Sequence, residues 1–266
     1  MRDRGTVDRV IGLLTYLASF EGPIHVSRIA TALDLPQSTV HRLINQMVKL
    51  GLLRRAANAR HYEIGIEAFR LGAALSQRVN VIVELAMPSL HRIGQFTKES
   101  CALGLYVEAD ATMFFAAQVQ SPHSLRYYLQ LFRTESVLWG TSGRVILAHL
   151  SRDMPAALLE GDPISPTGLK PLKLKTLQEE LDQVRRRGYA TSNRGERVMN
   201  SSGIAVPIFS APDRVVGCLT LATPTFRYSK QNEAKIAALM KREATAISSE
   251  LARGFSSPSR VRKLSG

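Results

Sequence analysis

Apolar residues recur at helical spacing along the first fifty residues. The segment 6–20 places an apolar stripe on one face of a helix, formed by Val7, Val10, Ile11, Leu14 and Leu17. A short second helix is predicted over 26–33. A third, over 37–50, is expected to bury Val40, Leu43, Ile44, Met47 and Leu50. The sequence Asp34-Leu35-Pro36 predicts a tight turn between the last two helices, and Gly51 predicts the end of the third.

Two short β-like runs follow the third helix. LLRR (52–55) and HYEIG (61–65) flank AANAR, and together they predict a hairpin with a polar, basic tip. Three helices with a tight turn, closed by a hairpin, are typical of a winged helix-turn-helix domain.

The pattern changes after residue 66. Residues 66–90 predict a linker helix that breaks near Asn80, and CALGLYVEADATMFFAAQVQ (101–120) predicts a β-hairpin. Further strands are expected over 124–132, 202–209 and 214–223, and further helices from a glycine-containing loop near 144, over 177–187 and over 229–251. This order predicts an α+β fold in which 1–66 form the winged helix-turn-helix domain, 67–81 the linker helix, 82–254 a second domain, and 255–266 a basic disordered tail.

Charge narrows the class of partner. The chain has 35 Lys and Arg against 22 Asp and Glu, a net charge of +13, which favours a polyanion such as nucleic acid or a membrane surface. Residues 1–70 carry only +4 of this excess, so net charge does not locate the binding site.

Location is inferred from what the chain lacks. No apolar run is long enough to span a membrane, and the N-terminus has no apolar segment typical of a secretory signal. The two cysteines, Cys101 and Cys218, lie in apolar surroundings and are expected to be buried free thiols. A cytoplasmic protein without membrane association is the expectation.

Specific motifs now point to a family. The segment GPIHVSRIATALDLPQSTVHRLINQMVKLGLL, above all its STVHRL core, resembles the DNA-binding domain of the IclR family of bacterial transcription regulators. SGRVILAHL, LDQVRRRGYATSNRGE and SGIAVPIF resemble motifs of its C-terminal half, so the resemblance covers about residues 6–252. It implies a GAF-like effector-binding domain, a small organic acid effector, a palindromic double-stranded DNA operator, and assembly as homodimers or homotetramers. The same parts would serve a repressor or an activator.

The resemblance gives a role to the polar first turn of the third helix. A recognition helix enters the major groove by its N-terminus, so its opening side chains meet bases and phosphates. The expected DNA contacts there are Gln37, Ser38, Thr39, His41 and Arg42, with Arg42 suited to guanine or to a phosphate. Phosphate contacts are expected from Arg28 on the preceding helix and from Arg54 and Arg60 around the wing.

The resemblance also implies an effector site. Family members that sense small oxo-acids hold the ligand carboxylate at a loop matching Thr141, Ser142 and Gly143, and complete the site with Asp, Cys and Ser residues. At those positions this chain has Asn193, Gly203, Thr220 and Ala222. The loss of a charge and of wall volume favours a larger, less polar ligand, such as an aromatic acid. Apolar lining could come from Phe115, Tyr128, Trp139 and Met199, although core packing is the favoured role of each.

Two other classes of function stay open. An enzyme is disfavoured because GTSGR satisfies neither the nucleophile elbow nor the Walker A pattern, and the six histidines form no metal-binding motif. Neither a metal nor a cofactor is expected. The altered pocket positions also leave open a DNA-binding architectural protein that takes no ligand. A small oxo-acid such as glyoxylate or pyruvate is the alternative effector.

Overall fold

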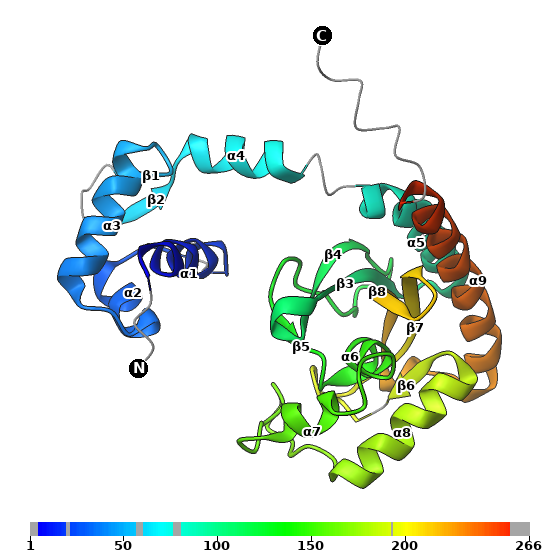
Figure 1. Ribbon diagram of the computed structural model, residues 1–266. Helices are drawn as coiled ribbons and strands as arrows, with labels where there is room; N and C mark the ends of the chain where they lie inside the picture. Colours follow the sequence, from blue (N-terminus) through cyan, green and yellow to red (C-terminus); the bar gives the residue numbers. More distant parts are fainter. Residues whose placement is uncertain (1–4, 20–21, 57–60, 77–80, 193, 256–266) are drawn as a thin grey trace. The chain divides into compact units, whose positions relative to one another are not determined.

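The computed structural model describes residues 5–19, 22–56, 61–76, 81–192 and 194–255. The chain divides into two compact units, Met1–Val81 and Ile82–Gly266, which are described separately. Figure 1 shows the elements of both units.

The first unit is a helix-turn-helix with a hairpin wing. Its elements are α1 (Thr6–Ser19), α2 (Val26–Leu33), α3 (Gln37–Lys49), β1 (Leu53–Arg55), β2 (Tyr62–Ile64) and α4 (Ile66–Ser76). The antiparallel pairing of β1 with β2 confirms the predicted hairpin, and a bridge between Ile24 and Tyr62 ties the wing to the chain before α2. The core of the unit is formed by Leu13, Leu17, Ile24, Ile29, Ala30, Val40, Leu43, Ile44, Met47 and Leu53.

Two details of the predicted apolar faces were wrong. On α1 the fully buried positions are Leu13 and Leu17, whereas Val7 and Ile11 are 74% and 56% exposed. Leu50 was expected to be buried but is 65% exposed, because α3 ends at Lys49 and Leu50 is its C-terminal cap. The other four apolar positions predicted for α3 are buried.

The second unit is built on a six-stranded antiparallel sheet. Its strands follow the order β5-β4-β3-β8-β7-β6 and are β3 (Ser100–Val107), β4 (Thr112–Val119), β5 (Glu135–Ser136), β6 (Ala190–Ser192), β7 (Ser201–Ala211) and β8 (Arg214–Pro224). The helices are α5 (Val81–Thr97), α6 (Gly140–Leu147), α7 (Met154–Leu159), α8 (Leu174–Arg187) and α9 (Lys230–Phe255), with 3-10 turns η1 (Glu108–Asp110) and η2 (Thr225–Arg227).

Side-chain alternation along the strands gives this sheet two buried faces. On β8, Leu219 and Leu221 pack with α5 and α9, whereas Cys218 joins the core under α6 and α8. Figure 1 shows α5 and α9 on one side of the sheet and α6 and α8 on the other. Positions 218, 220 and 222 of β8 therefore face α6.

The expected strand over 124–132 was wrong. This segment forms no strand, and its one β-bridge to the sheet joins Leu131 to Phe115. The Gln118 side chain bonds both backbone groups of Leu129: Nε2 donates to the carbonyl at 3.0 Å, and the amide donates to Oε1 at 3.3 Å. A side chain thus takes the place that a neighbouring strand would have filled.

The start of α6 also differs from the expectation of a loop reaching to about Arg144. The helix begins at Gly140, which turns the chain with a φ of +67°, so Thr141, Ser142 and Gly143 lie in its first turn.

Both cysteines are buried and free, as predicted. Burial raises the pKa of each thiol, Cys101 and Cys218, to about 12. Among the described residues, no helix is long and apolar enough to cross a membrane.

Candidate DNA-reading edge and effector cavity

The first turn of α3 presents polar side chains to solvent. Gln37, Ser38, His41 and Arg42 are exposed, and Thr39 is half-buried. The buried face of the helix fixes this orientation, since Val40, Leu43, Ile44 and Met47 lie in the core. Pro36 is the N-cap and no side chain of the described residues caps the helix, so its first amides are oriented for an external acceptor.

Basic side chains flank this turn. Arg28 is exposed on α2, and Arg54 on β1 is 70% exposed and paired with Glu63 across the hairpin at 2.5 Å. Arg55 bonds Asn45 Oδ1 at 3.4 Å and lies over the Tyr62 ring. Arg60, a predicted phosphate contact, lies outside the described residues. Helix α3 and the wing thus form one basic, hydrogen-bonding edge.

A small cavity of about 70 Å³ lies between the start of α6 and the sheet. It brings together five of the predicted effector residues: Thr141, Ser142, Gly203, Thr220 and Ala222. Two predicted apolar side chains, Phe115 and Tyr128, also line it. On its floor, Ser142 Oγ donates to Thr220 Oγ1 at 3.1 Å. The cavity lining therefore combines hydroxyl groups and aromatic rings with the charged side chains of Glu196 and Arg197.

The position taken by Cys in the family motif is occupied by Gly203. A methyl group at Gly203 would stand 2.8 Å from the Leu221 carbonyl oxygen and 2.9 Å from Thr141 Oγ1. Thr141 therefore fills the space that the missing side chain leaves, and this wall of the cavity is not widened.

Three predicted residues do not line this cavity, and one is not described. Gly143 packs against the Val137 backbone, where an added Cβ would stand 2.4 Å from the carbonyl oxygen. Trp139 is a buried core residue and Met199 is 70% exposed. Asn193 lies outside the described residues.

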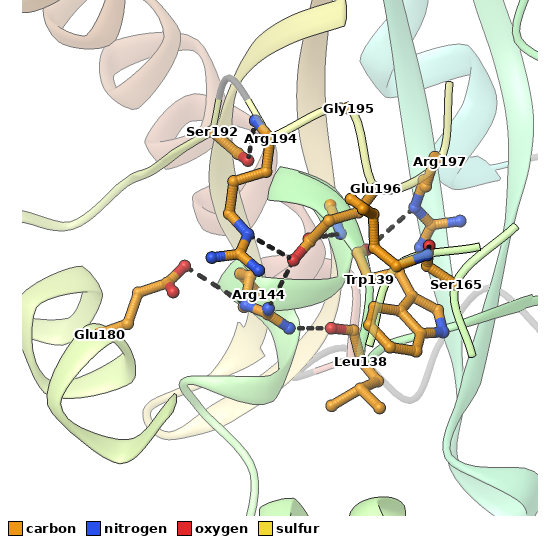
Figure 2. A network of polar contacts seen from close by, with 12 residues as sticks. Leu138, Trp139, Arg144, Ser165, Glu180, Ser192, Arg194, Gly195, Glu196 and Arg197 are labelled. Carbon is orange, nitrogen blue, oxygen red and sulfur yellow. Dashed lines mark hydrogen bonds and ion pairs between the residues drawn. The ribbon is translucent and has the colours of Figure 1, made fainter. Parts of the chain in front are cut away.

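A buried carboxylate sits at the start of α6. Glu196 accepts the Gly140 amide at Oε2 (2.8 Å), and its Oε1 accepts from Arg144 at 3.0 Å and from Arg194 at 3.1 Å. Figure 2 shows this carboxylate between the two guanidinium groups. Arg144 and Glu196 are only 1% and 3% exposed, so this is a fully desolvated ion pair. Arg144 also bonds Glu180 at 3.3 Å and the Leu138 carbonyl.

A third arginine supports the chain before α6. Arg197 bonds the Trp139 carbonyl at 2.9 Å, the Glu135 carboxylate at 2.6 Å and the Ser136 carbonyl at 2.8 Å. Desolvation lowers the pKa of this guanidinium, against the opposing effect of Glu135. Arg197 borders the cavity, but its charge is committed to these neighbours.

The sequence interpretation missed Arg144, Glu196 and Arg197. One feature of the sequence pointed to Arg144. It directly precedes the apolar run VILA, which predicts burial, and a buried guanidinium requires a carboxylate partner. No spacing rule identifies Glu196 as that partner, because 52 positions separate it from Arg144. In the part of the chain that the structure describes, no cluster of His, Cys, Asp and Glu could hold a metal ion.

A larger groove, of about 590 Å³, lies between α9 and β7. His149 lines it, and the buried Nε2 of this side chain has no hydrogen-bond partner among the described residues. The His149 ring stands edge-on to Phe209, with ring centroids 5.0 Å apart. Desolvation lowers the pKa of His149. Of these two, the smaller cavity alone combines the α6 terminus with the predicted effector residues.

Comparisons with known proteins agree on the family. The family model described as the IclR helix-turn-helix domain matches residues 6–57, and the one described as Bacterial transcriptional regulator IclR C-terminal matches residues 74–249. The transcriptional regulator KdgR of Escherichia coli K12 is 28% identical, with 92% of each chain covered. The transcriptional regulator BhcR of Paracoccus denitrificans is 30% identical, with 84% of this chain and 78% of BhcR covered.

Solved structures share the fold. A putative IclR transcriptional regulator from Silicibacter sp. TM1040 superimposes with a TM-score of 0.79 at 24% identity, covering 93% of this chain and 96% of the other. An IclR homolog from Microbacterium hydrocarbonoxydans, solved with 4-hydroxybenzoate, has a TM-score of 0.75 at 21% identity, covering 94% and 100%.

These matches confirm the predicted fold class, and they confirm that the chain is a regulator rather than an enzyme. The chain belongs to the IclR family of transcriptional regulators, with an N-terminal DNA-binding helix-turn-helix domain and a C-terminal effector-binding domain.

Proposed function

We propose that the chain binds its double-stranded operator through the first turn of α3, with Gln37, Ser38, Thr39, His41 and Arg42 reading the major groove. The observation that carries this proposal is an uncapped helix start whose polar side chains face solvent while the opposite face is buried. Arg28, Arg54 and Arg60 would hold phosphates beside it.

We propose a palindromic operator and assembly as a homodimer or homotetramer, a proposal that exposed apolar side chains on two helices support. Val7 and Ile11 on α1 are exposed, and so are Ile66 and Phe69 on α4, at 75% and 72%. No described residue of α4 is buried, although the helix is rich in apolar side chains. Such apolar surface favours a second copy, and a two-fold dimer reads two half-sites. We place this activity in the cytoplasm.

We infer that the effector is a small organic acid held in the cavity at α6 and that it modulates operator binding. An aromatic acid is supported by Phe115 and Tyr128 on the cavity wall and by the hydroxyl groups around them. The Microbacterium relative, solved with 4-hydroxybenzoate, shows that this fold accommodates such a ligand.

A small oxo-acid is the second candidate, because the cavity is small. Its volume of about 70 Å³ is well below the roughly 300–1,000 Å³ typical of sites for drug-sized ligands. Glyoxylate or pyruvate would fit without rearrangement of the walls, whereas a benzoate would require Tyr128 or its segment to move.

Fluorescence anisotropy with the chain's own promoter fragment tests both parts. We expect tight binding to this fragment and weaker binding to a random duplex. We also expect one acid class, 4-hydroxybenzoate or pyruvate and glyoxylate, to shift the affinity. Equal affinity for both duplexes would remove the operator proposal. An operator complex that ignores every acid would leave a DNA-binding protein without a ligand.

A further inference from the structure

The N-terminus of α6 is already occupied by a carboxylate of the chain itself. Glu196 accepts the Gly140 amide at 2.8 Å, and both residues border the effector cavity. Figure 2 shows Glu196 reaching this position from the segment before β7. The family resemblance assigns the effector carboxylate to the neighbouring residues Thr141, Ser142 and Gly143, so Glu196 occupies the first amide of the same helix terminus.

We propose that Glu196 is an internal competitor for the effector carboxylate and thereby sets the selectivity of the cavity. An acid that binds the first amides of α6 must displace Glu196 from Gly140. This inference rests on the proposed function, in which an acid binds at this end of α6.

Electrostatics favours the exchange. Two ionised carboxylates at one desolvated helix terminus repel each other, and each disfavours the ionised form of the other, so an entering acid favours the release of Glu196. Two cations, Arg144 and Arg194, hold Glu196 in place. They would attract an entering carboxylate just as strongly.

The residues around Glu196 would keep their charges paired or solvated after Glu196 leaves Gly140. Arg144 retains Glu180, 3.3 Å away and 27% exposed in its side chain, so its buried guanidinium keeps a partner. Arg194 is 41% exposed and could accompany Glu196 into solvent. Thr167 Oγ1 donates to the carbonyls of Gly195 and Glu196 at 2.9 and 3.0 Å, so the exchange would also change the contacts of the neighbouring segment.

The test compares charged ligands with neutral analogues of the same shape. 4-Hydroxybenzoate is paired with 4-hydroxybenzamide, and pyruvate with pyruvamide. Binding to the full chain and to Glu196→Gln is followed by calorimetry and by the fluorescence of Trp139, the single tryptophan, which precedes α6. Glu180→Gln is the matched control, because Glu180 also pairs with Arg144 but neither caps Gly140 nor lines the cavity.

We expect Glu196→Gln to bind the acid at least about tenfold more tightly, which corresponds to about 1.4 kcal/mol of binding free energy. Its affinity for the amide analogue should change by less than about twofold. Glu180→Gln should tighten neither ligand, because Glu180 does not occupy the Gly140 amide. A purely structural Glu196 would instead weaken acid and amide together, and that result would overturn the proposal. So would an equal gain for both ligands.

A measurement on the unaltered chain covers the case in which Glu196→Gln does not fold. The ¹⁵N resonance of the Gly140 amide should shift with the acid and much less with its amide analogue. An unmoved resonance at saturation refutes the competition. If acids release the operator equally well from the wild type and Glu196→Gln, the competition fails while the proposed function stands. If no acid binds either form, the effector part of the proposed function fails as well.

Discussion

Two helices of this chain begin with similar short polar sequences and lead to opposite uses. Helix α3 begins Gln37-Ser38-Thr39 in solvent, without a side-chain cap among the described residues. Helix α6 begins Gly140-Thr141-Ser142 inside the second unit, where Glu196 caps it. Helix termini attract anions in both places, and burial decides which anion can arrive. In the proposed function, the exposed terminus of α3 would meet a DNA phosphate, whereas the buried terminus of α6 would take an external carboxylate only in exchange for Glu196.

The largest expected effect comes from breaking the charge network behind α6. Arg144→Ala removes the cation that pairs with buried Glu196 and should cost about 3–5 kcal/mol in the free energy of unfolding. Urea titration followed by Trp139 fluorescence measures it, because this tryptophan reports on the second unit alone. Exposed Arg133→Ala is the control, with a change within about 0.5 kcal/mol. A similar small loss for Arg144→Ala would contradict the buried-pair interpretation.

The next effect concerns recognition at α3 rather than stability. Arg42→Ala should lose about 1–3 kcal/mol of specific operator binding and relax the preference at one base pair, while stability stays nearly constant. Anisotropy on an operator set with single base changes measures both. If specific and random duplexes weaken equally, Arg42 contacts a phosphate and reads no base.

The wing should affect the salt dependence of binding. Arg54→Ala removes one phosphate contact, so the slope of log affinity against log salt should fall by about one, irrespective of sequence. Arg253→Ala is a matched control, since Arg253 is equally exposed and also ion-paired, but lies on α9. A slope that is the same in Arg54→Ala and wild type would place Arg54 away from DNA.

The smallest expected effect separates folding from binding at the same residue. Ser38→Asp places a carboxylate at the α3 terminus and should stabilise the first unit by about 0.3–1 kcal/mol, while weakening DNA binding by repulsion from phosphates. Ser38→Asn, which is neutral, controls for size. Thermal melting and anisotropy follow the two quantities, and improved DNA binding would contradict the assignment of this edge.

The sequence predicted elements well where periodicity and turn residues agree. Three such features are the Pro36 turn, the apolar stripe of α3 and the hairpin at 53–64. Each depends on residues within a few positions of one another, so the local sequence pattern is enough to predict it. The segment 124–132 has the composition of a strand, yet the Gln118 side chain satisfies the backbone at Leu129 instead. Such a contact between distant side chain and backbone leaves no periodic signal.

The effector site was only partly foreseeable for the same reason. The family motif located Thr141, Ser142, Gly203, Thr220 and Ala222 around one cavity. It did not reveal that Thr141 fills the space beside Gly203 or that Glu196 caps α6, because both depend on tertiary contacts.

The burial of both cysteines limits the kinds of signal that this regulator can receive. A thiol with a pKa of about 12 holds almost no thiolate at neutral pH, and thiolate is the form that attacks peroxides and disulfides. We therefore expect oxidants to leave the operator occupancy of this regulator unchanged. The regulator would then respond to a bound molecule and not to cysteine oxidation.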